Sequence, residues 1–223
     1  MKKLLVFASG DEEGGGSGAR KLAENAKAGV LQAEIVGFVS NHPAGGVFKH
    51  AQEMGIPFFY FPGPYTAENY QSYLVKTGAE FVACSGWIKY CRGLPSDRTV
   101  NIHPAPLYRF GGQGMYGLHV HEVVLEAFRR GEITCTEVCM HFVIEDPSDK
   151  EKGFDKGPVF FRVEVEIQGD DIPKSLQARV NKVEHAYQSI ITNKVVTGQI
   201  RWDGKNPLSL VGAEEYRLSA VGI

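Results

Sequence analysis

The chain lacks the sequence features that define several large classes of protein. None of its 223 residues belongs to an apolar run approaching the ~20 residues that a membrane-spanning helix needs. With 24 basic and 26 acidic residues the net charge is -2, so the basic surface of a nucleic-acid-binding protein is missing. The four cysteines lie in apolar surroundings and lack the paired spacing of a zinc site. They are Cys84, Cys91, Cys135 and Cys139. We therefore expect a cytoplasmic protein with reduced thiols, and neither a membrane nor a nucleic acid as its partner.

The histidines do not indicate a metal centre either. His119 and His121 are two residues apart near the start of a predicted helix, but no cysteine or carboxylate pair accompanies them. We interpret these side chains as packing or capping groups and expect no metal.

Segments with the composition of strands and helices alternate along most of the chain. Apolar runs predict strands at 3–8, 33–40, 58–61, 81–85, 100–102, 134–144 and 159–167. Helical composition and spacing predict helices at 19–28, 47–54, 67–77, 118–130 and 172–192. This order is typical of βαβ units, so the sequence predicts an α/β protein with a Rossmann-like, mostly parallel sheet flanked by helices. Ligands of such sheets bind beyond the carboxyl ends of the strands.

A glycine-rich segment joins the first predicted strand to the first predicted helix. It ends in Gly16, Ser17 and Gly18. Free amides at a helix N-terminus attract an anion, and glycine lets the backbone approach it closely. The Ser17 hydroxyl is predicted to act at the N-cap position. Because neither a dinucleotide fingerprint nor a Walker lysine is present, we predict a site for one phosphate group. The alternative is a surface loop, and the acidic residues 11–13 are expected to point away from any anion.

The segment Asn101-Ile102-His103-Pro104 follows a predicted buried strand. Residues two apart on a strand point to the same side, so Asn101 and His103 are expected to act together. The amide can donate to a developing oxyanion, and the imidazole can move a proton. Asp155 is predicted to lie on a tight turn before the next strand, where it would hold the imidazole in its charged form and raise its pKa. The structural alternative for each of these residues alone remains open.

Several short motifs recur in the order of one known family across nearly the whole chain. They are Gly16-Ser17, Val39-Ser40-Asn41, Asn101-Ile102-His103-Pro104, Gly117-Leu118-His119-Val120-His121, Met140-His141-Phe142-Val143, Asp155-Lys156-Gly157-Pro158-Val159 and Glu184-His185-Ala186. Together they resemble the formyltransferases that use 10-formyltetrahydrofolate. The resemblance implies a single formyltransferase domain over residues 1–223, with a phosphate-binding half at 1–100 and a catalytic and folate-binding half at 101–223.

The resemblance also implies roles for individual residues. Catalysis would belong to Asn101, His103 and Asp155, and substrate binding to Gly16, Ser17, Gly18 and Glu184. The folate co-substrate would lie against Ile88, Lys89, Tyr90 and Cys91, with His141 on a neighbouring strand supporting the site. Three departures from the family pattern are the longer loops at 10–18, 104–117 and 145–155. A fourth is Gly18, which stands where an asparagine is common.

The implied reaction is formyl transfer from 10-formyltetrahydrofolate to the amine of glycinamide ribonucleotide in purine biosynthesis, with these small-molecule substrates as partners. Three alternatives remain open at this stage. The acceptor could be water, as in a deformylase, or another amine such as a nucleotide-linked amino sugar. The fold could also serve as a binding module without catalysis.

Overall fold

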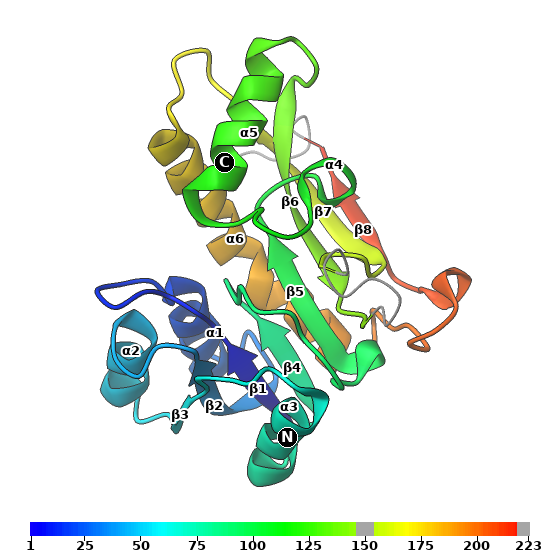
Figure 1. Cartoon of the computed structure of the whole chain (residues 1–223). Coiled ribbons are helices and arrows are strands. Elements are labelled where there is room, and N and C mark those ends of the chain that lie inside the picture. Colours follow the sequence, from blue (N-terminus) through cyan, green and yellow to red (C-terminus); the bar gives the residue numbers. More distant parts are fainter. Residues whose placement is uncertain (146–153, 218–223) are drawn as a thin grey trace.

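The computed structural model describes residues 1–145 and 154–217. In these residues eight strands form one sheet in the order β3-β2-β1-β4-β5-β6-β7-β8 (Figure 1). The strands are β1 Lys2–Phe7, β2 Ala33–Ser40, β3 Phe58–Tyr60, β4 Phe81–Cys84, β5 Thr99–His103, β6 Cys135–Phe142, β7 Val159–Glu166 and β8 Glu214–Tyr216. The helices are α1 Ser17–Lys27, α2 Gly46–Met54, α3 Ala67–Thr77, α4 Leu107–Phe110, α5 Gly117–Arg129 and α6 Pro173–Val196, with short 3-10 turns at Ser96–Arg98 and Pro207–Ser209.

The first five strands pair in parallel, as the alternation of strands and helices predicts. The strand β6 then runs antiparallel to both β5 and β7, while β8 is parallel to β7. The sheet is therefore mixed but mostly parallel, and the predicted α/β class is confirmed.

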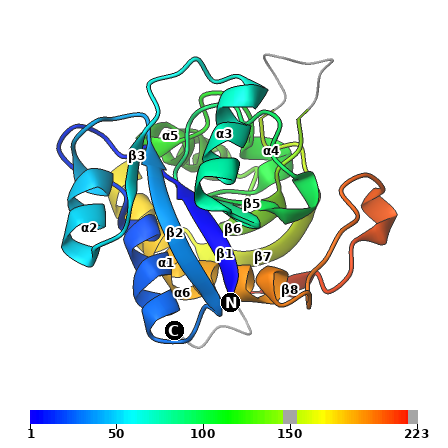
Figure 2. The same cartoon turned by 90° about the horizontal axis from the view of Figure 1, so that it is seen from below.

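Two apolar clusters cover the two faces of the sheet. Along β1 the side chains alternate, with Leu4 and Val6 packed on one face and Leu5 and Phe7 on the other. The first face is covered by α1, α2, α5 and α6, and the second by α3 through Tyr70 (Figure 2). Because both faces are buried, the strands carry continuous apolar runs, which made them visible in the sequence.

Most of the predicted elements lie within two residues of the observed ones. The strand at 33–40 and the helix at 67–77 have the predicted bounds, whereas α6 runs four residues further than predicted. Two elements are additional: α4 lies inside the predicted loop 104–117, and β8 lies beyond the last predicted element. Of the longer loop at 145–155, residues 146–153 lie outside the described residues. Within the described ranges, no helix combines the length and apolarity needed to cross a bilayer.

Candidate active site

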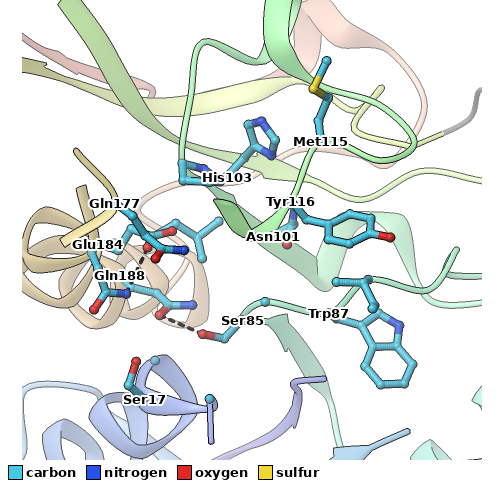
Figure 3. A pocket seen from close by; sticks show the side chains of 18 of the residues that line it. Ser17, Ser85, Trp87, Asn101, His103, Met115, Tyr116, Gln177, Glu184 and Gln188 are labelled. Carbon is cyan, nitrogen blue, oxygen red and sulfur yellow. Dashed lines mark hydrogen bonds between the residues drawn. The ribbon is translucent and has the colours of Figure 1, made fainter. Parts of the chain in front are cut away.

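A cavity of about 470 Å³ opens at the carboxyl ends of β1, β4 and β5. Its wall includes the start of α1, one face of α6, and the segment that leads into α5. The position agrees with the general rule that ligands of open α/β sheets bind beyond the carboxyl ends of the strands. Figure 3 shows side chains from both halves of the chain converging on this space.

The predicted catalytic pair lies at the carboxyl end of β5. Both Asn101 and His103 line the cavity, as their spacing of two on a strand predicts. The antiparallel register places His141 of β6 directly beside Asn101. The Asn101 amide Nδ2 lies 3.0 Å from His141 Nε2 and 3.3 Å from Asp155 Oδ1. The structure thus brings together four of the predicted site residues from three separate segments.

Asp155 sits on a tight turn, as predicted, and its backbone has a positive φ of 59°. Few non-glycine residues adopt this conformation, and aspartate is among those that tolerate it. One carboxylate oxygen accepts a hydrogen bond from the Gly112 amide at 3.0 Å and lies 3.7 Å from His103 Nδ1. The other accepts from Asn101 and lies 3.3 Å from His141 Nε2. Burial would raise the pKa of Asp155, but these partners outweigh it and bring the pKa to about 2.

The orientation of the His103 ring is set by a backbone carbonyl. Nε2 lies 2.8 Å from the Phe110 carbonyl oxygen, which can only accept, so Nε2 carries a proton. In the neutral ring Nδ1 is therefore unprotonated and faces Asp155. Burial opposes the predicted charged form of the imidazole. Burial lowers the pKa of His103 below its usual value, and the nearby Asp155 only partly offsets this.

In His141 the other ring nitrogen, Nδ1, faces a backbone carbonyl. Its Nδ1 donates to the Phe142 carbonyl at 2.8 Å, which leaves Nε2 of the neutral ring to accept from the Asn101 amide. Both hydrogens of Asn101 Nδ2 are therefore engaged, one by His141 and one by Asp155. An amide held at two points has a defined direction, and a ligand must replace one of these acceptors to bind it.

The glycine-rich loop lies at the other end of the cavity. Gly16, Ser17 and Gly18 all line it, whereas residues 11–13 do not, as predicted. The prediction that Ser17 is the N-cap is wrong. The N-cap is Gly16, whose φ of 79° favours glycine, and Ser17 is the first helical residue. The Ser17 hydroxyl lies 3.1 Å from His185 Nε2 instead. Within the described residues, the amides of Ser17, Gly18 and Ala19 have no backbone acceptor, whereas that of Arg20 donates to the Gly16 carbonyl.

One face of α6 lines the cavity beside the loop. Glu184 lies on this face, and Asn181 donates to its carboxylate at 3.3 Å. Burial raises the pKa of Glu184 to about 7, although the residue keeps some contact with the solvent of the cavity. The sequence analysis missed Gln188 one turn further on, and Ser85 after β4, which both line the cavity.

The residues predicted to hold the folate divide between two spaces. Ile88 lines the main cavity, and its amide donates to Ser9 Oγ at 3.1 Å. The others line an adjoining pocket of about 40 Å³. These are Lys89, Tyr90, Cys91 and His141. The rings of Tyr90 and Phe154 meet in this pocket with centroids 5.2 Å apart. A space of this size holds ordered water but not a two-ring heterocycle, so a bound pteridine would require these rings to separate.

The described residues contain no group of three or more histidine, cysteine, aspartate or glutamate side chains arranged to hold a metal ion. The four cysteines are free, and Cys84 and Cys91 lie with their sulfur atoms 3.8 Å apart.

Comparison with known proteins identifies the family. The chain matches the formyl transferase model over residues 2–192 and belongs to that family of enzymes, which confirms the resemblance of the sequence motifs. It is similar to the chloroplast phosphoribosylglycinamide formyltransferase of Arabidopsis thaliana, with 32% identity over 213 residues, covering 90% of this chain and 68% of that protein. The phosphoribosylglycinamide formyltransferase of Bacillus subtilis is 28% identical over 203 residues, covering 86% and 93% respectively.

The fold comparison agrees with the sequence comparison. The crystal structure of the phosphoribosylglycinamide formyltransferase of Bacillus halodurans superposes with a TM-score of 0.72 and 26% identity, covering 88% of this chain and 96% of that one.

Proposed function

We propose that this formyltransferase transfers the formyl group of 10-formyltetrahydrofolate to the primary amine of glycinamide ribonucleotide in purine biosynthesis. The observation that carries this is a single cavity with unbonded helix amides at one end and the cluster of Asn101, His103 and Asp155 at the other. The first end suits a phosphate, and the second suits acyl transfer to an amine. The names of the similar proteins support glycinamide ribonucleotide as the acceptor.

His103 acts first as a base in this mechanism. Its lowered pKa leaves the ring neutral near pH 7, and its free Nδ1 can accept a proton from the attacking amine. The amine nitrogen bonds to the formyl carbon, and the carbonyl oxygen becomes an oxyanion. Asp155, 3.7 Å from Nδ1, stabilises the imidazolium that forms. The imidazolium then returns the proton to the folate nitrogen as the bond between that nitrogen and the formyl carbon breaks.

Asn101 is the donor to the oxyanion. His141 and Asp155 hold its Nδ2 at the end of the cavity before substrate binds. The formyl oxygen receives a hydrogen bond from Nδ2 as the amide turns from one of these acceptors toward the substrate. This arrangement supplies an oriented dipole where the negative charge develops.

Folate binding is proposed at Ile88, Lys89, Tyr90, Cys91 and His141, with 10-formyltetrahydrofolate as a co-substrate and no metal in the reaction. We propose that residues 1–223 work as one domain in which the phosphate site of residues 1–100 is completed by α6 from the second half. The cytoplasm remains the proposed compartment, since all four cysteines are free thiols.

A formyl-transfer assay with a panel of acceptors tests the proposal. The purified protein is offered 10-formyltetrahydrofolate with glycinamide ribonucleotide, with a nucleotide-linked amino sugar, or with water alone. We expect rapid transfer to glycinamide ribonucleotide only. Hydrolysis at the same rate without an amine would instead identify a deformylase, and transfer to the amino sugar alone would identify the other alternative.

Replacement of Asn101 by alanine separates catalysis from binding. We expect Asn101→Ala to lower kcat by about 10²–10³-fold while the protein stays folded, because one oxyanion donor is lost. The matched control is Asn69→Ala on α3, where the amide also donates a hydrogen bond but does not line the cavity. A normal kcat for Asn101→Ala would remove the amide from the mechanism.

A further inference from the structure

Gln188 is a buried amide that the catalytic cluster does not use. The residue is 2% exposed and lies on the face of α6 that lines the cavity. Its Oε1 accepts a hydrogen bond from the Ser85 hydroxyl at 3.2 Å. Its Nε2 has no hydrogen-bond partner among the described residues, yet it is not sealed away from the cavity. Figure 3 shows Ser85 and Gln188 pointing toward one another on the side of the cavity where Ser17 lies.

The pair fits only because residue 18 has no side chain. A Cβ atom on Gly18 would overlap Ser85 Oγ and would lie 3.1 Å from Gln188 Oε1. The backbone of Gly18 is ordinary helix and does not require glycine for its conformation. The space that a side chain would fill at this position is therefore occupied by the hydroxyl and the amide.

Because Nε2 opens onto the cavity, its acceptor there is water or a ligand, and a ligand that displaces the water must supply an equivalent acceptor. Gln188 adjoins Gly18 in the first turn of α1, where unbonded backbone amides favour an anion. An anionic oxygen accepts more strongly than a neutral one, and it matches the two hydrogens of Nε2.

We propose that Gln188 is a substrate-binding residue that donates from Nε2 to the phosphate of the phosphorylated amine, and that Ser85 is the residue that positions it. The inference rests on the proposed function for the identity of the substrate. The backbone amides of α1 bind the phosphate from one side, and the Gln188 amide binds it from the floor of the cavity. Gly18 makes this possible by leaving the space open. The site thus selects a phosphate monoester and discriminates against the unphosphorylated amine.

The test measures both substrates separately in the full chain. In Gln188→Met, which keeps the volume but removes the donor, we expect the KM for glycinamide ribonucleotide to rise about 10–100-fold, the range typical of a lost hydrogen bond to a charged group. We expect kcat and the KM for 10-formyltetrahydrofolate to stay within about twofold. In Gln188→Glu the KM for the phosphorylated amine should rise further, because a carboxylate repels phosphate. The control is Thr192→Val, a buried residue one turn further along α6 whose hydroxyl also lacks a partner but does not line the cavity.

Ser85 and Gly18 provide variants that leave the glutamine in place. Ser85→Ala should raise the same KM, but less than Gln188→Met does, and the double variant should match Gln188→Met alone because Ser85 acts through Gln188. Gly18→Ala should displace the pair and raise the KM as well. If any Gln188 variant does not fold, these two variants carry the test.

The affinity for ribose 5-phosphate, measured by calorimetry without folate, distinguishes this inference from the proposed function. If the unaltered protein does not formylate glycinamide ribonucleotide, the proposed function fails, and ribose 5-phosphate binding still tests Gln188. Weaker binding of this probe in Gln188→Met supports the inference. Unchanged binding and an unchanged KM overturn it, and so does an equal rise in the KM of both substrates, which would indicate a structural role only.

Discussion

Asp155 is the residue on which the catalytic cluster depends most, and Asp155→Asn removes its charge while keeping its shape. The carboxylate lies 3.7 Å from His103 Nδ1. At an effective dielectric constant of about 20, an imidazolium at that distance gains about 4 kcal/mol from the carboxylate. We expect most of this stabilisation to be lost from the step in which His103 takes the proton. We therefore expect kcat to fall by about 10²–10³-fold, equivalent to about 3–4 kcal/mol.

The pH-rate profile of Asp155→Asn should shift in a defined direction. Asp155 raises the pKa of His103 against the larger lowering by burial, so the pKa should be lower still in Asp155→Asn. Because the neutral ring is the base, the acidic limb of kcat/KM should move to lower pH.

The substitution Asp155→Asn should also change the stability of the protein. The pKa of Asp155 is lowered from 3.8 to about 2, so its contribution of about 2 kcal/mol is complete above pH about 4 and is lost as the pH falls through 2.

Stopped-flow single turnovers and pH-rate profiles with glycinamide ribonucleotide measure these effects. His103→Ala combined with Asp155→Asn should cost little more than either change alone, since the two residues act as a unit. Asp97→Asn, which alters an exposed carboxylate paired with Arg98, is the control and should leave the profile unchanged. An acidic limb that stays in place in Asp155→Asn, or losses that add in free energy, would refute the coupling between the carboxylate and the imidazole.

Two further predictions concern stability. Burial raises the pKa of Glu184 from 4.5 to about 7, so the unfolded chain ionises more readily and the natural protein loses stability between these pH values. Glu184→Gln should therefore be as stable as the natural protein near pH 4.5 and about 1–3 kcal/mol more stable at pH 8 by urea denaturation, the lower figure allowing for the solvent in the cavity. Gly16→Ala should destabilise the protein by more than Gly29→Ala. Both glycines have φ of 79°, but a Cβ on Gly16 meets Val47 at 2.7 Å, whereas one on Gly29 meets nothing within 4 Å. Equal losses in thermal melts would show that backbone conformation alone is responsible.

Elements with strong local signals could be predicted from the sequence. The helix at 67–77 has an N-cap threonine before it and a glycine in the left-handed conformation after it, and its bounds are those predicted. β8 has no such signal, because it is a three-residue strand of two glutamates and a tyrosine that exists only through pairing with β7. Its position depends on a contact between segments about fifty residues apart, which composition and periodicity do not reveal.

In the site, too, features set by neighbouring residues could be predicted, whereas contacts between segments distant in the sequence could not. The spacing of Asn101 and His103 along one strand predicts that both face the cavity. The resting charge of His103 could not be predicted, because it depends on how deeply the ring is buried and on the Phe110 carbonyl that fixes its proton. Gln188 was missed because a glutamine in an amphipathic helix has no signal of its own. Its role becomes visible only when α6 is packed against α1.

The charges in the cavity are arranged so that few negative groups compete. Asp155 accepts hydrogen bonds from the Asn101 amide and the Gly112 backbone N–H, which favour its ionised form, and it therefore stabilises the cation that forms on His103. The phosphate of the proposed substrate is held at the far end by neutral donors, the α1 amides and Gln188, which add no positive charge that would compete with the imidazolium for the oxyanion.

Between these ends Glu184 has its pKa raised toward neutrality and carries less than a full negative charge near pH 7. A full negative charge at Glu184 would repel the phosphate, and a lysine in place of Gln188 would pair with the carboxylate as readily as with the ligand. A neutral amide held by a hydroxyl avoids both problems, which is why we expect Gln188→Lys to bind the phosphorylated amine more weakly than the natural protein despite its added positive charge.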